Sequence, residues 1–272
     1  GDAVKTSTFN GIYVTKIRKT GNSNYESARK DACTYAASVY QAFDRDHPEV
    51  FWLSGTSKLR ILTAKVKYGT QTVEEAYMFF TLADNSGFSL RTPDYQAAGT
   101  VAAGIQKRDQ LRDAILASLT GTNSYEKVRQ LNRWLTEHNE YNTTPDLTTI
   151  GNAPHECLSA LAGSIGVNGP VCDGYSKAFK VLCDKLGIPC VLADGYAKPR
   201  AQDAGEAHMW NYVQMDDKGW YGVDVTWNDP MVKGASGAKS GYENEKFLLV
   251  GTNTMIEGLT FGVSHPETNR AA

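Results

Sequence analysis

The sequence predicts an α+β fold in which a helix packs on an antiparallel sheet. Apolar residues recur at helical spacing over 178–186, behind a cysteine at Cys172, and Gly187 supplies the expected stop. Residues 207–213 and 220–227 alternate as strands do, and a polar turn at 216–219 joins them into a hairpin. A region of mixed helix and strand precedes these elements.

The N-terminal region is predicted to be a small α/β unit, for which the sequence suggests no role. Helical spacing of apolar residues predicts a helix that ends near Phe43. Strand-like segments follow at 59–68 and 76–82. A further helix is expected from about Gln106 to Leu119, with one apolar face.

The predicted domain boundary falls at residues 121–124, where Gly121 ends one helix and Asn123 caps the next. The buried stripe of that second helix is expected to be Val128, Leu131, Trp134 and Leu135. The sequence therefore divides into an N-terminal region, 1–120, and a second domain, 121–272.

Cys172 is placed where a cysteine could be nucleophilic. The free N–H groups and the positive dipole end of a helix favour thiolate over thiol, so its pKa is expected below the ordinary ~8.5. A buried cysteine is more often a small hydrophobic residue than a nucleophile. Here, however, His208 and Asp224 follow in the hairpin. A thiol nucleophile needs a base and a third group that orients the base, and these residue types meet that need.

Four motifs in this part of the chain resemble the transglutaminase-like superfamily, which is related to papain-like cysteine proteases. They are Val171-Cys172-Asp173-Gly174-Tyr175, Leu186-Gly187-Ile188-Pro189-Cys190, His208-Met209-Trp210-Asn211 and the run from Gly219 to Pro230. The resemblance covers about residues 125–230. It implies a transglutaminase-like (papain-like) core, and the run from Asp46 to Trp52 resembles the N-terminal portion of secreted bacterial proteins of this kind. It also implies Cys172 as nucleophile, His208 as base and Asp224 as the orienting partner.

Other residues near these motifs are candidates for smaller roles. Tyr141, Trp210 and Trp227 are expected to line the site or bind substrate, with a share in oxyanion binding for Tyr141; core packing is the alternative for all three. Asn211 resembles a residue that the family places beside the histidine. Asp173 receives no role, and His155, Cys157 and His265 are interpreted as packing or surface residues. The polar segment 197–206 is predicted to form a loop over the cleft.

The residue types and the resemblance together predict a reaction class. Thiolate attack on a carboxamide would give a thioester acyl-enzyme. Water as acceptor makes the protein a protease or deamidase, which we favour, whereas a lysine amine makes it a protein cross-linking transglutaminase. From another class, a cell-surface binding module without turnover stays open. No EF-hand loop and no Cys-x-x-Cys pair occurs, so no cofactor and no metal is expected.

The amino-acid composition limits the classes of binding partner that we expect. The formal net charge is -2 and the pI about 6.2, without a dense Lys/Arg cluster, which argues against nucleic acid or an anionic membrane as partner. No apolar run reaches the ~18 residues that a membrane-spanning helix needs. A protein or peptide substrate is therefore expected. The high content of Asn, Thr, Ser, Gly and Tyr predicts an extracytoplasmic or secreted protein whose signal peptide is absent from the sequence.

The hairpin makes a geometric prediction. His208 and Asp224 can share a face only if the turn at 216–219 has an odd length or a bulge. A three-residue loop, 216–218, would set Trp210 opposite Asp224 and His208 diagonally beside it. Gly219 is predicted to take the positive φ that such a turn needs.

Overall fold

The computed structural model describes residues 3–6, 9–53, 58–81, 85, 88, 99–145, 153–230 and 241–268. Its contacts divide the chain into two compact units, one of residues 1–47 and 53–85 and one of residues 48–52 and 86–272. Helix α2 (Gly99–Ala117) belongs to the second unit, although it precedes residue 121. As a boundary between separately folding domains, residue 121 stays a prediction.

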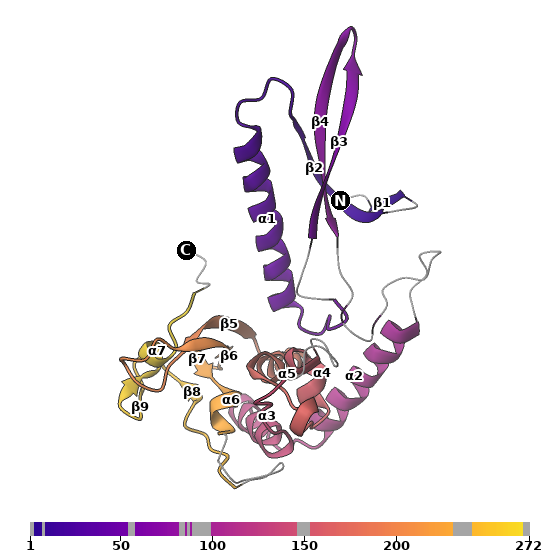
Figure 1. The fold of residues 1–272 in the computed structure, drawn as a ribbon. Helices are drawn as coiled ribbons and strands as arrows, with labels where there is room; N and C mark the ends of the chain where they lie inside the picture. The colour runs from indigo at the N-terminus through magenta and orange to yellow at the C-terminus, as the bar shows by residue number, and fades with distance from the viewer. Residues whose placement is uncertain are drawn as a thin grey trace. The chain divides into compact units, whose positions relative to one another are not determined.

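The first unit contains an antiparallel sheet and one long helix (Figure 1). The sheet has the order β1-β2-β4-β3, with the strands β1 (Ala3–Thr6), β2 (Phe9–Arg18), β3 (Lys58–Tyr68) and β4 (Gln71–Thr81). Helix α1 (Tyr25–Asp46) contacts β2, and the ring of its Tyr40 lies 5.3 Å from that of Phe80. Strands β3 and β4 were predicted, whereas β1 and β2 were not.

The second unit contains α5 (Cys172–Lys185) and further helices, of which α2, α3, α4 and α6 contact α5. The further helices are α2, α3 (Ser124–His138), α4 (Cys157–Leu161), α6 (Val225–Asn228) and α7 (Phe261–Ser264), with the 3-10 turns η1 (Ala153–His155) and η2 (Gly166–Asn168). Tyr175, Phe179 and Leu182 of α5 are fully buried. Each such apolar side chain contributes about 1.5–3 kcal/mol on burial, so the core fixes α5 firmly.

The ends of two helices follow the sequence prediction. Asn123 caps α3, and its side chain accepts a hydrogen bond from the backbone N–H of Glu126 at 2.9 Å. Helix α5 begins at Cys172 as predicted, and Gly187 takes a φ of 70° just beyond its end. The nucleophile candidate is therefore the first residue of a buried helix.

The sheet of the second unit is antiparallel and has the order β5-β6-β7-β8 (Figure 1). Its strands are β5 (Cys190–Ala197), β6 (Glu206–Gln214), β7 (Trp220–Val223) and β8 (Leu248–Val250), and a separate pair is formed by β9 (Met255–Ile256) and β10 (Leu259–Thr260). Helix α5 contacts β5 and β6 of this sheet. The predicted α+β arrangement of a helix on an antiparallel sheet is confirmed.

The β6–β7 hairpin has the predicted register. Asn211 pairs with Val223, and the same register continued by one pair sets Trp210 opposite Asp224. The N–H of Met215 donates to the carbonyl of Gly219 at 3.0 Å and closes a three-residue loop. The residue with positive φ is Lys218, at 66°, so the prediction of Gly219 was wrong. In a loop of this kind the left-handed residue is the last one of the loop, directly after a type I turn.

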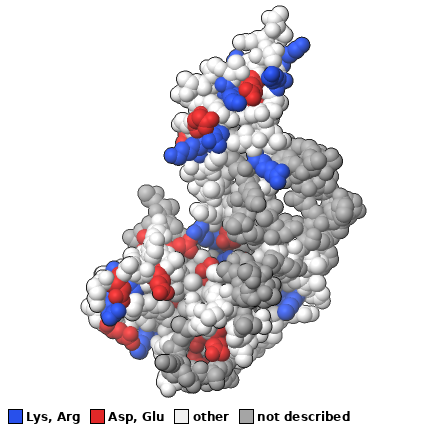
Figure 2. Space-filling model, in the orientation of Figure 1, with Lys and Arg blue, Asp and Glu red and all other residues white. Residues whose placement is uncertain are grey.

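The described surface carries mixed charge. Figure 2 shows Lys, Arg, Asp and Glu side chains scattered among uncharged residues on the face in view. None of the helices in the described part of the chain is long and apolar enough to cross a membrane.

Candidate active site

Cys172 lies in the first turn of α5, which is anchored to η1. The N–H of Val171, just before the helix, donates to the carbonyl of Pro154 at 3.0 Å. One turn on, a Cβ at Gly174 would lie 2.4 Å from the same carbonyl oxygen, closer than real Cβ atoms come. Only glycine allows this approach, so the Cys-Asp-Gly-Tyr segment fixes where Cys172 sits. The Cys172 side chain is 9% exposed.

Strand β6, which carries His208, is linked to α5 by two hydrogen bonds. The Asn211 side-chain amide donates to the Ser176 carbonyl at 3.0 Å, and the Ser176 hydroxyl donates to the Met209 carbonyl at 2.9 Å. All three residues lie within four positions of Cys172 or His208 along the chain. These bonds set the strand of the histidine relative to the helix of the cysteine, which gives Asn211 a structural function.

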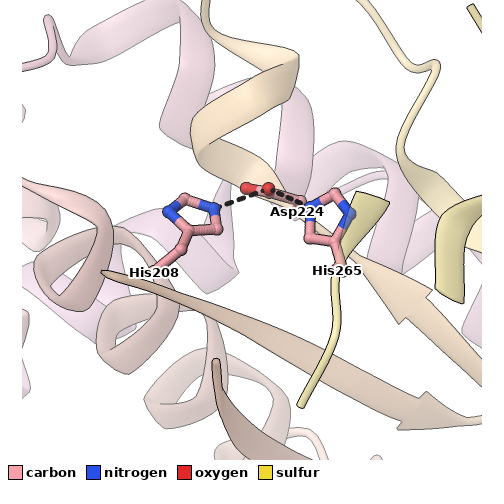
Figure 3. Close-up of side chains that lie close together, drawn as sticks. All are labelled: His208, Asp224 and His265. Carbon is pink, nitrogen blue, oxygen red and sulfur yellow. Dashed lines mark hydrogen bonds and ion pairs between the residues drawn. The ribbon is translucent and has the colours of Figure 1, made fainter. Parts of the chain in front are cut away.

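Asp224 lies between two histidines (Figure 3). Its Oδ2 is 2.7 Å from Nε2 of His208 and 3.0 Å from Nε2 of His265. His208 and Asp224 therefore share a face, as predicted from the hairpin. His265 is fully buried, and its Nδ1 lies 2.8 Å from the Ser264 hydroxyl. The carboxylate thus joins β7 to the segment that ends α7.

The second oxygen of Asp224 caps α6. Oδ1 accepts a hydrogen bond from the Trp227 N–H at 3.0 Å, and the backbone carbonyl of Asp224 accepts one from the Asn228 N–H at 3.1 Å. The strand predicted over 220–227 was therefore too long, because the chain turns into a helix at Asp224. An aspartate is a favoured N-cap residue, and here the cap also fixes the rotation of the carboxylate.

These contacts determine the charges on the histidine side of the site. Burial disfavours an ionised Asp224, but the charge and hydrogen bonds of His208 and His265 outweigh burial and lower its pKa. Burial likewise opposes a charged His208, yet the Asp224 carboxylate raises the pKa of His208 to about 10. Because Nε2 of His208 faces Asp224, Nδ1 is the ring nitrogen left for Cys172.

The surroundings of Cys172 shift the pKa of its thiol in opposite directions. Burial raises the pKa of its thiol, the hydrogen bond with His208 lowers it, and the Asp173 carboxylate raises it again. The net shift is upward, so the expectation of a pKa below the ordinary value was wrong. A helix N-terminus favours the thiolate, but burial of the sulfur acts more strongly here.

A cleft of about 580 Å³ opens beside His208. It is lined by Tyr141, Ala197, Pro199, Asp203, Gly205, Glu206, Ala207, His208, Thr226, Trp227, Asp229 and Pro230. Several of these residues come from 197–206, so this segment borders the cleft as predicted. Asp229, at the wall, is paired with the Tyr175 hydroxyl at 2.5 Å, and burial raises its pKa to about 7.

The three residues predicted to line the site or bind substrate, Tyr141, Trp210 and Trp227, lie in different places. Tyr141 and Trp227 line the cleft, and burial and the charge of Cys172 raise the pKa of Tyr141 to about 12. Trp210 is fully buried and stacks on His208 with ring centroids 6.2 Å apart, so it packs behind the imidazole. Binding of substrate or of an oxyanion by any of these residues stays a prediction.

Sequence reasoning assigned His265, Asp173 and His155 no function, yet all three belong to the site. His265 bonds to Asp224, and Asp173 lies against both the Cys172 sulfur and His155. His265 lies 41 residues beyond Asp224 and outside the recognised motifs, so no spacing pointed to it. Asp173 follows Cys172 directly in the sequence, but its contacts with the sulfur and with His155 are known only from the structure.

Among the described residues, one group could bring metal-ligand atoms together. It consists of His208, Asp224 and His265, whose ligand atoms lie within 4.8 Å of one another. Both imidazoles are at hydrogen-bond distance from the same carboxylate oxygen. Hydrogen bonds from the two histidines to Asp224 account for the short distances. We therefore interpret the three residues as a hydrogen-bonded group and not as a metal site.

Comparison with known proteins finds one family and two curated relatives that part of this chain resembles. Residues 113–225 match the sequence model of the transglutaminase-like superfamily. Mouse kyphoscoliosis peptidase is 27% identical over 140 residues, which is 48% of this chain and 20% of that protein. Human kyphoscoliosis peptidase is 25% identical over 138 residues, again 48% and 20% of the two chains. The chain thus spans about a fifth of the length of these curated relatives.

Two solved structures are also similar. A putative cysteine protease from Cytophaga hutchinsonii shares 16% identity at a TM-score of 0.34, covering 63% of this chain and 65% of that one. A structure described as a TGase shares 14% identity at a TM-score of 0.37, covering 75% and 51%. The region 113–225, which matches the transglutaminase-like superfamily, contains Cys172, His208 and Asp224.

Proposed function

We propose that this protein is a cysteine-dependent amide hydrolase, a protease or a deamidase, with Cys172, His208 and Asp224 as its catalytic triad. The observation that carries the proposal is the 2.7 Å contact between His208 and Asp224 beside a cysteine at the start of a buried helix. The contact keeps Nε2 of His208 on Asp224 and raises the affinity of the ring for a proton, so that Nδ1 can take and hold the proton of the Cys172 thiol.

The proposed reaction proceeds in two halves. His208 takes the thiol proton while the sulfur bonds to the carboxamide carbon, and the Cys172 N–H at the helix start is one donor to the oxyanion. The C–N bond then breaks, and the nitrogen leaves with the proton from His208. Water attacks the thioester and gives a proton to His208. The S–C bond breaks, the acid departs, and the sulfur recovers its proton.

Water is the acceptor that we propose. The curated relatives bear the name peptidase, which supports hydrolysis. The cleft beside His208 offers room for an extended peptide, with apolar walls at Tyr141 and Trp227. A lysine amine in place of water would make the protein a cross-linking transglutaminase.

A Cys172→Ala variant tests the proposal against a glutamine-containing unfolded protein, with a primary amine probe present. Mass spectrometry distinguishes cleavage, the gain of about one mass unit on deamidation, and incorporation of the amine. Wild type should cleave or deamidate, and Cys172→Ala should do neither while unfolding at nearly the same temperature. The matched control is Cys33→Ala, since Cys33 lies on α1 in the other unit.

Two results would contradict the proposal. Amine incorporation that exceeds hydrolysis would identify a transglutaminase. Turnover that persists in Cys172→Ala, or is missing from wild type on every substrate offered, would exclude the triad and favour a binding module.

A further inference from the structure

The Cys172 sulfur has a second polar neighbour besides His208. Its Sγ lies 3.3 Å from Oδ1 of Asp173, with the thiol as donor. The other carboxylate oxygen of Asp173 lies 3.1 Å from Nδ1 of His155 in η1. The side chains of His155 and Asp173 are 28% and 30% exposed. Two aspartate–histidine pairs therefore adjoin Cys172, Asp173 with His155 and Asp224 with His208.

The hydrogen bond to Asp173 has a consequence for the proton. A thiol that donates to Asp173 does not donate to His208, which is where the proton must go before attack. A carboxylate this close also disfavours a negative sulfur. Asp173 therefore works against the formation of the thiolate, whereas His208 works for it.

We propose that Asp173, held by His155, is a positioning residue that competes with His208 for the proton of Cys172 and keeps the sulfur a resting thiol. The S–H bond must turn from Asp173 to His208 before the sulfur can react. The inference rests on the proposed nucleophilic role of Cys172.

The charges around Asp173 agree with this function. Burial disfavours its ionised form, but His155 and Lys177 lower its pKa, so it is a carboxylate at neutral pH. Lys177 is itself bonded to Glu156 at 3.2 Å, which compensates most of its charge. The other titratable groups that face Asp173 are Tyr141 and, beyond the sulfur, His208. His155 is therefore the group that contacts the Asp173 carboxylate directly.

The test is the rate of alkylation of Cys172 by iodoacetamide from pH 5 to pH 9, with the labelled site identified by peptide mass spectrometry. Asp173→Asn keeps the shape, removes the charge and adds a donor, so labelling at pH 6 should rise about 10-fold, the equivalent of one pKa unit. His155→Phe leaves the Asp173 charge unbalanced, so labelling should fall several-fold. His155→Gln retains a donor and should restore part of the rate.

The double variant makes the test specific. Asp173→Asn combined with His155→Phe should label at the rate of Asp173→Asn alone, because His155 acts only through the carboxylate. Asp216→Asn, the same change of charge in the β6–β7 turn, is the control and should label as wild type does.

Three results would overturn the inference. They are unchanged or slower labelling in a folded Asp173→Asn variant, equal effects of His155→Phe with and without Asp173, and a change in Asp216→Asn as large as that in Asp173→Asn. If Asp173→Asn does not fold, Asp173→Ser is measured by the same criteria. Labelling reports on the sulfur without turnover, so a labelling response in a protein that cleaves nothing would contradict the proposed function and support the inference.

Discussion

The two aspartate–histidine pairs beside Cys172 contain the same groups in different surroundings. Asp224 and His208 are 2.7 Å apart, with side chains 0% and 7% exposed. Asp173 and His155 are 3.1 Å apart, with side chains 30% and 28% exposed. The buried pair also has a second histidine and a helix cap on the same carboxylate.

Solvent explains what each pair can do. Away from water the attraction between Asp224 and His208 is weakly screened, so the imidazole has one orientation and one tautomer. At the partly exposed pair, water and salt weaken the same attraction, and its net contribution is small. The first pair is suited to permanent positioning of a base, and the second to fine adjustment of a thiol.

The largest expected effect is the difference in kcat/KM between two variants that carry the same substitution, aspartate to asparagine, at Asp224 and at Asp173. Asp224→Asn should lower kcat/KM by roughly 10³-fold or more, because an amide no longer enforces the Nε2–H tautomer of His208. An asparagine oxygen can still accept the Trp227 N–H, so α6 should stay capped and the protein folded. Asp173→Asn should retain turnover. Steady-state kinetics of both variants measure the contrast, and equal losses would remove the distinction between the pairs.

A smaller effect is expected at His265, which only the buried pair possesses. His265→Phe deprives Asp224 of one donor and should lower kcat about 10-fold, with KM nearly unchanged, since one hydrogen bond to a charged group is worth roughly 1.5–3 kcal/mol. His265→Gln can donate again and should recover part of kcat. A His265→Phe variant with full activity and an unaltered pH profile would show that Asp224 needs His208 and the cap alone.

The stability of the buried pair should depend on pH in a defined direction. Asp224 raises the pKa of His208 to about 10, so this contribution is complete below the ordinary histidine value of ~6.5 and is lost as pH rises through about 10. The lowered pKa of Asp224 adds stability that is present above ~3.9 and lost at more acidic pH.

Chemical unfolding measures this dependence. In a Cys172→Ala background, the difference in unfolding free energy between His208 and His208→Gln proteins should be greatest between about pH 4 and pH 6.5. It should shrink from there to pH 10. A difference that stays constant over that range would mean that His208 gains no proton affinity from folding.

Some features around the two pairs could be predicted from the sequence. The start of α5 and the register of the β6–β7 hairpin followed from apolar spacing and the alternation of strand faces, which depend on local geometry. The meeting of His208 and Asp224 followed from that register. Lys218 was missed because its left-handed backbone is set by the turn type, and the adjacent glycine is the usual occupant of such a conformation.

The remaining site residues required the tertiary structure. His265 approaches Asp224 from the segment after α7, and His155 approaches Asp173 from η1. Nothing in the local sequence of either histidine carries that information. The upward shift in the pKa of Cys172 was missed for the same reason, since burial of a first-turn side chain depends on what packs over it.

The smallest predicted effect uses salt to distinguish the pairs by exposure. Raising the ionic strength from about 0.1 M to 1 M shortens the Debye length from roughly 10 Å to 3 Å. The partly exposed His155 and Asp173 should feel this change, whereas the buried Asp224 and His208 should not.

The alkylation rate of Cys172 at pH 6 measures that difference. With the charges at Asp173 screened, the carboxylate opposes the thiolate less, and labelling in wild type should rise about two-fold. The Asp173→Asn protein has no charge there to screen, so its rate should stay constant. An equal salt response in both proteins would mean that salt acts elsewhere, and that the exposure of the Asp173 pair does not control the nucleophile.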